Sequence, residues 1–239
     1  MNDLEILLAY HEQGQEKPFR EVPFVSPVDL NSRMKDGEVA SPSLAESRLF
    51  LDPPELKPET RWVGLCSPRW SEKWPGAPRI QDLESSLQLS SKKEGYAPAL
   101  IDIHLREEGD MYSELIANHP GIDVPLVEFA QHFALSLPEN TRAPWSNNFV
   151  VHREVYEDLL EFWNKAYDWA DSVWGLDIPF GFRCYECGQE SDEQIGRYGS
   201  YRQASFFYER VSMLFFATRP TNWVTLEERK GGELLLYKK

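Results

Sequence analysis

The sequence predicts a mixed α/β fold, a Rossmann-type sandwich in which helices flank a mainly parallel central sheet. Segments with strand-like and helix-like patterns alternate along the 239 residues. The strand-like segments are continuous apolar runs, which is typical of parallel strands that are buried on both faces. Hydrophobic residues make up 41% of the chain and aromatic residues 13%, enough for a substantial core. The length suits one large domain, so we expect a single domain over residues 1–239.

The first part of the chain is expected to hold two buried strands with a helix between them. Residues 4–12, LEILLAYHE, are an apolar run that ends in polar groups, as a strand opening onto a loop does. A short extended piece is expected around 22–25. Residues 43–51 have helical spacing, and the prolines that follow them break a helix. Residues 61–70 contain a second strand that ends at Pro68.

The rest of the chain is expected to contain more helix. Residues 71–96, with a Pro-Gly turn and a Ser/Lys stretch, indicate a loop. The clearest helix is 153–174, in which apolar residues recur every three or four positions opposite a charged face. The other expected elements are strands at 98–105 and 147–152, helices at 109–121, 123–137 and 201–220, and two short edge strands within 222–239.

The charge of the chain argues against several partners. The formal net charge is -14 and the pI is about 4.8, whereas phosphate backbones and anionic membranes attract clustered Lys and Arg. We therefore expect no nucleic-acid partner. No apolar run reaches the roughly 18 residues of a membrane span. The first residues lack a signal-peptide pattern, and we expect a soluble, cytoplasmic protein without a transmembrane segment.

The three cysteines do not indicate a disulfide framework, because their number is odd. Cys184 and Cys187 form a C-x-x-C pair, but the sequence has no second such pair and no histidine pair after it. A structural zinc site needs four ligands. We interpret both residues as ordinary loop cysteines.

Polar and aromatic side chains stand at the ends of the expected strands. In open α/β sheets, ligands bind outside the carboxyl ends of the strands. Aromatic rings stack on a base or sugar, amides bind hydroxyl groups and arginine binds phosphate. A nucleotide or sugar site is therefore predicted from Tyr10, His11, Arg69, Asn147, Asn148 and His152. For Tyr10, His11 and His152, a structural place at the rim of a strand is the alternative.

A Glu-Arg pair inside an apolar helix is a further candidate. Glu209 and Arg210 lie within ASFFYERVSMLFFA, which is apolar almost all round and is expected to be buried. A buried charge is costly unless it is paired. The pair is either a structural ion pair or a carboxylate that points into the site as a base or acceptor ligand. Both alternatives are open.

Several site motifs are missing from the sequence. It contains no G-x-G-x-x-G, no P-loop, no G-x-S-x-G and no H-E-x-x-H, which leaves the corresponding enzyme classes unsupported. Asp102 and His104, in Asp-Ile-His, resemble half of a metal site. Two ligands on one strand are weak evidence for a metal ion.

Five segments between about residues 4 and 217 follow one another in an informative order. They are ILLAYHE, LAESRLF, WVGLCSPRW, NNFVVHREVYEDLLEFW and ASFFYERVSMLFFA. This order resembles a family of bacterial and viral GT-A-type glycosyltransferases of capsule and lipopolysaccharide synthesis, whose members tend to show a Y-I-G-L-C-H-Y-R-R strand and a late F-L-A-E-R-L helix. The resemblance implies one GT-A-like domain. It also implies transfer of a sugar from a nucleoside-diphosphate donor, UDP-sugar being the first expectation, to a hydroxyl of a glycan or lipid-linked glycan.

The chain departs from the family at the diphosphate site. Where the family reads His-Tyr-Arg-Arg, this chain reads Ser-Pro-Arg-Trp at 67–70, so one arginine is left. Many GT-A enzymes hold the diphosphate through Mn²⁺ or Mg²⁺ on an Asp-x-Asp motif, which this chain lacks. Either Arg69 and other cations act without metal, or Asp102 and His104 contribute ligands, or activity has been lost.

The resemblance also implies roles for single residues. The donor-binding set is Ala9, Tyr10, His11, Glu46, Arg48 and Arg69. The candidates for binding the sugar or acceptor are Asn147, Asn148, His152 and Arg210, and Glu209 is the candidate catalytic base. A non-catalytic carbohydrate- or nucleotide-binding module is the alternative function. The missing Asp-x-Asp, eight Trp and ten Tyr support this alternative.

Overall fold

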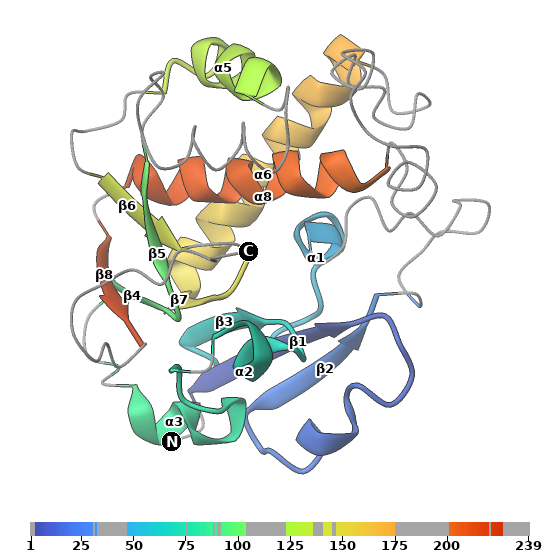
Figure 1. The fold of residues 1–239 in the computed structure, drawn as a ribbon, viewed down its shortest axis with the longest axis vertical. Helices are drawn as coiled ribbons and strands as arrows, with labels where there is room; N and C mark the ends of the chain where they lie inside the picture. Colours follow the sequence, from blue (N-terminus) through green and yellow to red (C-terminus); the bar gives the residue numbers. More distant parts are fainter. Residues whose placement is uncertain are drawn as a thin grey trace.

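A six-stranded sheet forms the centre of the protein in this computed structural model (Figure 1). The structure describes residues 3–30, 32, 47–74, 76–87, 89, 92–103, 123–135, 141–144, 147–174, 201–219 and 221–226. In spatial order, the strands are β2 (Val25–Asp29), β1 (Leu4–Tyr10), β3 (Trp62–Cys66), β7 (Phe149–His152), β4 (Glu94–Ala97) and β8 (Asn222–Thr225). All run parallel except β7, which is antiparallel to both its neighbours.

Two apolar clusters, one on each face, hold this sheet between layers of helix. Along β1, Leu7 and Ala9 enter one cluster, and Ile6 and Leu8 enter the other. The first face is covered by α1 (Arg48–Leu51), α5 (Asp123–His132), α6 (Arg153–Trp174) and α8 (Tyr201–Ala217). The second is covered by η1 (Lys17–Phe19), α2 (Trp70–Lys73), η4 (Ile80–Asp82) and α3 (Leu83–Ser86). The predicted α/β sandwich with a mainly parallel sheet is confirmed.

Aromatic rings in contact join the helices of the first layer. Helix α6 buries the stripe predicted from its spacing, which includes Leu159 and Trp163. The Trp163 ring lies 5.1 Å from that of Phe50 in α1 and 4.5 Å from that of Tyr208 in α8. Aromatic pairs of this kind add about 0.5–1.5 kcal/mol to what burial contributes. The contacts fix α1, which begins beside the carboxyl ends of the strands, to the two long helices.

A separate two-stranded sheet packs against α8 (Figure 1). It consists of β5 (Leu100–Ile103) and β6 (Thr141–Pro144), which are antiparallel. The strand predicted at 98–105 therefore forms, but it lies outside the central sheet. No local pattern distinguishes a strand of one sheet from a strand of another.

The predicted loop at 71–96 is wrong, because the segment contains α2, η4, α3 and the strand β4. These elements have three or four residues each, too few for a period to show. Burial of Trp70, Ile80 and Leu83 in the second cluster holds them in place. The extended piece predicted around 22–25 shares only Val25 with the edge strand β2, which continues to Asp29. Pro27 is tolerated in β2 because one side of an edge strand needs no ladder hydrogen bond. The helix predicted at 109–121 lies outside the described residues.

Candidate functional site

The carboxyl ends of β1, β2 and β3 meet at one edge of the central sheet, and the start of β7 joins them there. Tyr10 lies opposite Asp29 in the β1–β2 register, and Leu8 lies opposite Cys66 in the β1–β3 register. Because β7 is antiparallel, it is its first residues that reach this edge: Phe149 pairs with Leu65. We call this region the strand-end edge. It brings together residues that are far apart in the sequence.

Tyr10 and Asp29 form the β1–β2 part of the strand-end edge. Both side chains are half-buried, and buried Ala9 precedes Tyr10. Partial burial and the neighbouring Asp29 carboxylate raise the pKa of Tyr10, so its hydroxyl stays protonated and can donate a hydrogen bond. Sequence reasoning missed Asp29, because it placed the extended piece before the true end of β2.

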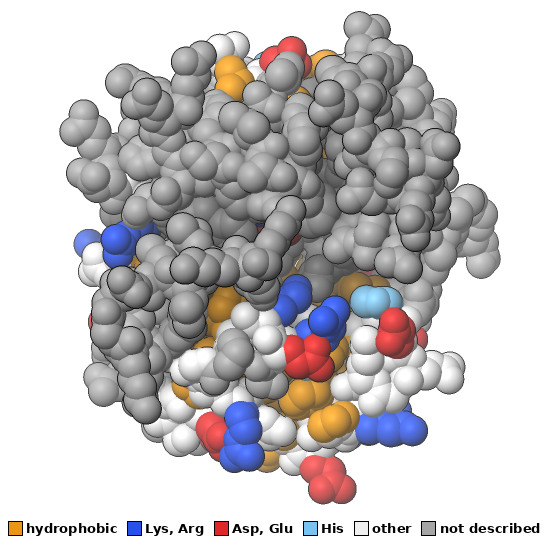
Figure 2. All heavy atoms as spheres, viewed as in Figure 1, with side chains coloured by type: hydrophobic (Ala, Val, Ile, Leu, Met, Phe, Trp, Pro, Cys, Tyr) orange, Lys and Arg blue, Asp and Glu red, His pale blue; other side chains and the backbone are white. Residues whose placement is uncertain are grey.

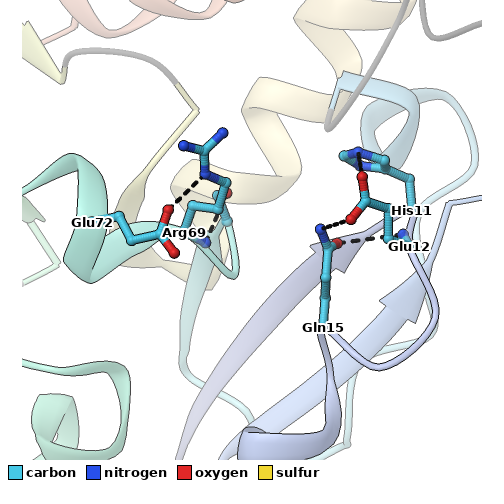
Figure 3. A network of polar contacts seen from close by, with 6 residues as sticks. His11, Glu12, Gln15, Arg69 and Glu72 are labelled. Atoms are coloured by element: carbon cyan, nitrogen blue, oxygen red, sulfur yellow. Dashed lines mark hydrogen bonds and ion pairs between the residues drawn. The ribbon is translucent and has the colours of Figure 1, made fainter.

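Arg69 and His11 lie on either side of the strand ends (Figure 3). Arg69 Nε donates to Glu72 Oε2 at 2.8 Å, and both side chains are about two-thirds exposed, at 65% and 67%. His11 lies 3.9 Å from Glu12, whose carboxylate accepts a hydrogen bond from Gln15 at 3.1 Å. Figure 2 shows basic, acidic and histidine side chains gathered over the strand ends. The edge therefore presents charges of both signs on an otherwise acidic protein.

Asn147 and Asn148 are buried, with exposures of 5% and 2%. Asn148 Oδ1 accepts the backbone N–H of Ser67 at 3.0 Å and so ties the start of β7 to the end of β3. Asn147 Nδ2 donates to Ser47 Oγ at 3.0 Å, beside Arg48 at the start of α1. Among the described residues, Asn147 Oδ1 is buried without a hydrogen-bond partner. An unpaired buried polar atom is costly and calls for an explanation such as a bound ligand or water.

Glu209 and Arg210 lie in α8, in the helix layer rather than at a strand end. Their side chains are 18% and 2% exposed, and Arg210 Nη1 lies 3.1 Å from Glu209 Oε1. The ring of Tyr208, the neighbouring residue, packs at a tilt against Trp163, which in turn contacts Phe50 in α1. Two aromatic contacts thus connect this part of α8 to α1.

The structure does not bring His152 to the strand-end edge. His152 ends β7 and pairs with Trp62, the first residue of β3, so it lies at the opposite edge of the sheet. Its ring packs edge-on against the Trp62 ring at 5.6 Å, and burial lowers its pKa. The antiparallel direction of β7 explains this placement.

Three candidates cannot be placed as side chains. Glu46 and His104 lie outside the described residues, and Asp102 is described only as part of the β5 backbone, in the separate sheet. Among the described side chains, no group of three or more His, Cys, Asp or Glu could hold a metal ion. Within the same part of the chain, no helix has the length and apolar character needed to cross a membrane.

Comparisons with known proteins gave one distant likeness of shape. No family model and no curated protein matches the chain. The solved apo structure of WbbM, a bifunctional glycosyltransferase, is similar over 95% of this chain and 45% of that chain, at 11% identity and a TM-score of 0.45. This chain thus spans less than half the length of that protein. The function proposed below rests on the residues of the strand-end edge.

Proposed function

We propose that this protein is a glycosyltransferase that moves a sugar from a nucleoside-diphosphate donor to an acceptor hydroxyl. UDP-sugar is the first candidate for the donor, and a glycan or lipid-linked glycan is the candidate acceptor. The observation that carries the proposal is the buried Asn147 amide, which has one polar atom without a partner among the described residues, at the edge where Tyr10 and Arg69 also lie. A sugar hydroxyl can donate the hydrogen bond that the Asn147 amide oxygen lacks within the described part of the chain.

The donor side of the proposal uses the chemistry of the strand-end edge. The Tyr10 ring offers a face for the base or ribose, and its protonated hydroxyl offers a donor. Asp29 accepts hydrogen bonds from ribose hydroxyls, as a carboxylate after the second strand does in other nucleotide-binding α/β folds. Arg69 binds the diphosphate, because guanidinium and phosphate make charge-assisted paired hydrogen bonds.

The transfer step assigns a role to Glu209. The acceptor oxygen forms a bond to the anomeric carbon while the bond from that carbon to the diphosphate oxygen breaks. The hydroxyl proton passes to the Glu209 carboxylate, and the diphosphate leaves with the electron pair on its oxygen beside Arg69. Arg210 Nη1 lies 3.1 Å from Glu209 Oε1, and this ion pair positions the carboxylate. This step uses no metal ion as a participant.

A binding module without turnover is the second candidate. The observation that favours it is the Glu209–Arg210 pair itself, because a largely buried carboxylate with a fully buried arginine partner also fits a structural ion pair. In that case the strand-end edge would bind a nucleotide or carbohydrate, and no sugar would be transferred.

A thermal-shift screen against UDP-, GDP-, CMP- and dTDP-sugars, with and without Mn²⁺, tests binding. A ligand that binds only the folded state stabilises it, by about 2.7 kcal/mol at a hundred times its Kd. We expect one class of donor to raise the melting temperature, and Arg69→Ala to abolish that rise. A screen in which no donor shifts the transition would refute the glycosyltransferase and a nucleotide-binding module alike.

Turnover separates the two candidates. We expect Glu209→Gln to reduce nucleoside-diphosphate release about 10²- to 10⁴-fold, the usual contribution of a general base. The variant should keep the donor-induced thermal shift, which shows that the site still folds. Glu161→Gln, at an exposed glutamate paired with Lys165 on α6, is the control and should keep full activity. Undiminished turnover in Glu209→Gln would remove Glu209 from the mechanism.

A further inference from the structure

We infer that Glu72 is a positioning residue that sets how tightly Arg69 holds a diphosphate, and that it thereby favours release of the product. The inference rests on the proposed function. It starts from a contrast at Arg69 between a fixed backbone and an exposed side chain.

The backbone of Arg69 is fixed by a short chain of hydrogen bonds. Its N–H donates to Ser67 Oγ at 3.3 Å, and the Ser67 N–H donates to the buried amide oxygen of Asn148 at 3.0 Å. Arg69 also forms the N-cap position of α2. The sheet therefore determines where the Arg69 side chain begins.

Among the described residues, Glu72 pairs with that side chain. It lies one turn further along α2, and its carboxylate accepts the Arg69 Nε–H at 2.8 Å (Figure 3). Both groups are about two-thirds exposed, and exposed pairs of this kind contribute little to stability. The pair can therefore open or turn toward a stronger anion at little cost. The carboxylate stays close by, because helix geometry keeps positions three apart adjacent.

A carboxylate at this position opposes anions in proportion to their charge. The diphosphate of a nucleotide sugar carries about two negative charges. A free nucleoside diphosphate carries about three near neutral pH, because its last ionisation has a pKa of about 6. Repulsion by Glu72 is therefore stronger for the product than for the donor. Glu72 should weaken product binding more than donor binding and leave an uncharged nucleoside unaffected.

The same chain offers a matched control pair. Arg79 Nε donates to Asp82 Oδ2 at 2.7 Å with the same spacing, and both side chains are exposed, at 71% and 45%. This pair lies at η4, one of the elements that cover the second face of the sheet, and neither residue belongs to the proposed donor-binding set. Asp82→Asn changes the net charge by as much as Glu72→Gln does. It therefore controls for any general effect of charge on an acidic protein.

Titration calorimetry of the full chain with UDP, GDP, UDP-glucose, uridine and guanosine tests the inference. We expect the nucleoside diphosphate that the wild type binds to have an about three- to tenfold higher affinity for Glu72→Gln. The gain in affinity should be smaller for UDP-glucose and absent for the nucleoside. The gain should shrink as salt rises, and Asp82→Asn should match the wild type.

The outcomes separate this inference from the proposed function. Equal affinity for the diphosphate in the wild type and in Glu72→Gln, or an equal gain for the nucleoside, overturns the role of Glu72 alone. A wild-type protein that binds none of these nucleotides, and none of the donors in the thermal-shift screen, overturns the proposed function, and the inference with it.

Discussion

Glu5 is buried in β1, and three donors surround its carboxylate. It is 3% exposed and accepts hydrogen bonds from Ser26 Oγ, from the Lys57 N–H at 3.0 Å and from Thr60 Oγ1 at 2.8 Å. Burial alone would raise the pKa of Glu5, but these hydrogen bonds, with a smaller contribution from the Lys57 charge, outweigh it and lower the pKa. The carboxylate thus ties the segment before β3 to the edge of the sheet.

The lowered pKa of Glu5 predicts a pH dependence of stability. A carboxylate whose pKa is lower in the folded state contributes stability that is fully present above its unfolded pKa, about 4.3. That contribution is lost as the pH falls through the folded value. We expect Glu5→Gln to lose about 1–3 kcal/mol in urea unfolding at pH 7 and much less near pH 3. The same loss at both pH values would contradict the assignment.

The two asparagines of the strand-end edge should respond differently to substitution. Asn148→Ala leaves the buried Ser67 N–H without its acceptor, so we expect a loss of about 1–3 kcal/mol of stability. Asn147→Ala removes a hydrogen bond but also the unpaired oxygen, so we expect at most about 1 kcal/mol. Donor binding should instead fall in Asn147→Ala. Chemical unfolding and donor titration of both variants, side by side, check this; equal stability losses would refute it.

Gly64 shows how tightly the strands pack at the centre of the sheet. A Cβ built at Gly64 would lie 2.3 Å from Ile6 Cδ1 and 3.0 Å from Val150 Cγ2, so the neighbours on β1 and β7 occupy the space that a side chain would need. Overpacking of this kind costs about 1–3 kcal/mol.

The clash at Gly64 predicts a coupling between two strands. We expect Gly64→Ala to destabilise the protein by about 1–3 kcal/mol, and Ile6→Val, which removes Cδ1, to restore part of the loss. A double-mutant cycle measured by urea unfolding gives the coupling energy. Strictly additive effects would show that β1 moves aside instead.

The elements that could be predicted are those with a long or strong pattern. Helix α6 forms over the predicted range 153–174, because its apolar stripe repeats over six turns. The apolar runs of β1 and β3 likewise predicted buried strands. The short helices α2 and α3 could not be predicted, since tertiary packing rather than local pattern holds them.

The sequence predicted those residues of the candidate site that lie next to the end of a predictable strand. Tyr10, Arg69, Asn147 and Asn148 adjoin apolar runs, and the structure places all four at one edge. A local pattern carries no information on strand direction. Because β7 is antiparallel, His152 at its end lies at the opposite edge of the sheet from Asn147 and Asn148, which precede its start. The sequence did not indicate a role for Glu72, because it is a single charged residue in a segment that was predicted to be a loop.

The order of the strands gives β7 a role beyond its four residues. It is the only described strand that pairs with both parts of the sheet, β2, β1 and β3 on one side and β4 and β8 on the other. Strand β7 directly follows Asn147 and Asn148, where the proposed ligand would bind. A bound sugar would therefore stabilise both parts of the sheet at once. Amide protons of strands well away from the strand-end edge, on either side of β7, should exchange more slowly when the sugar is present.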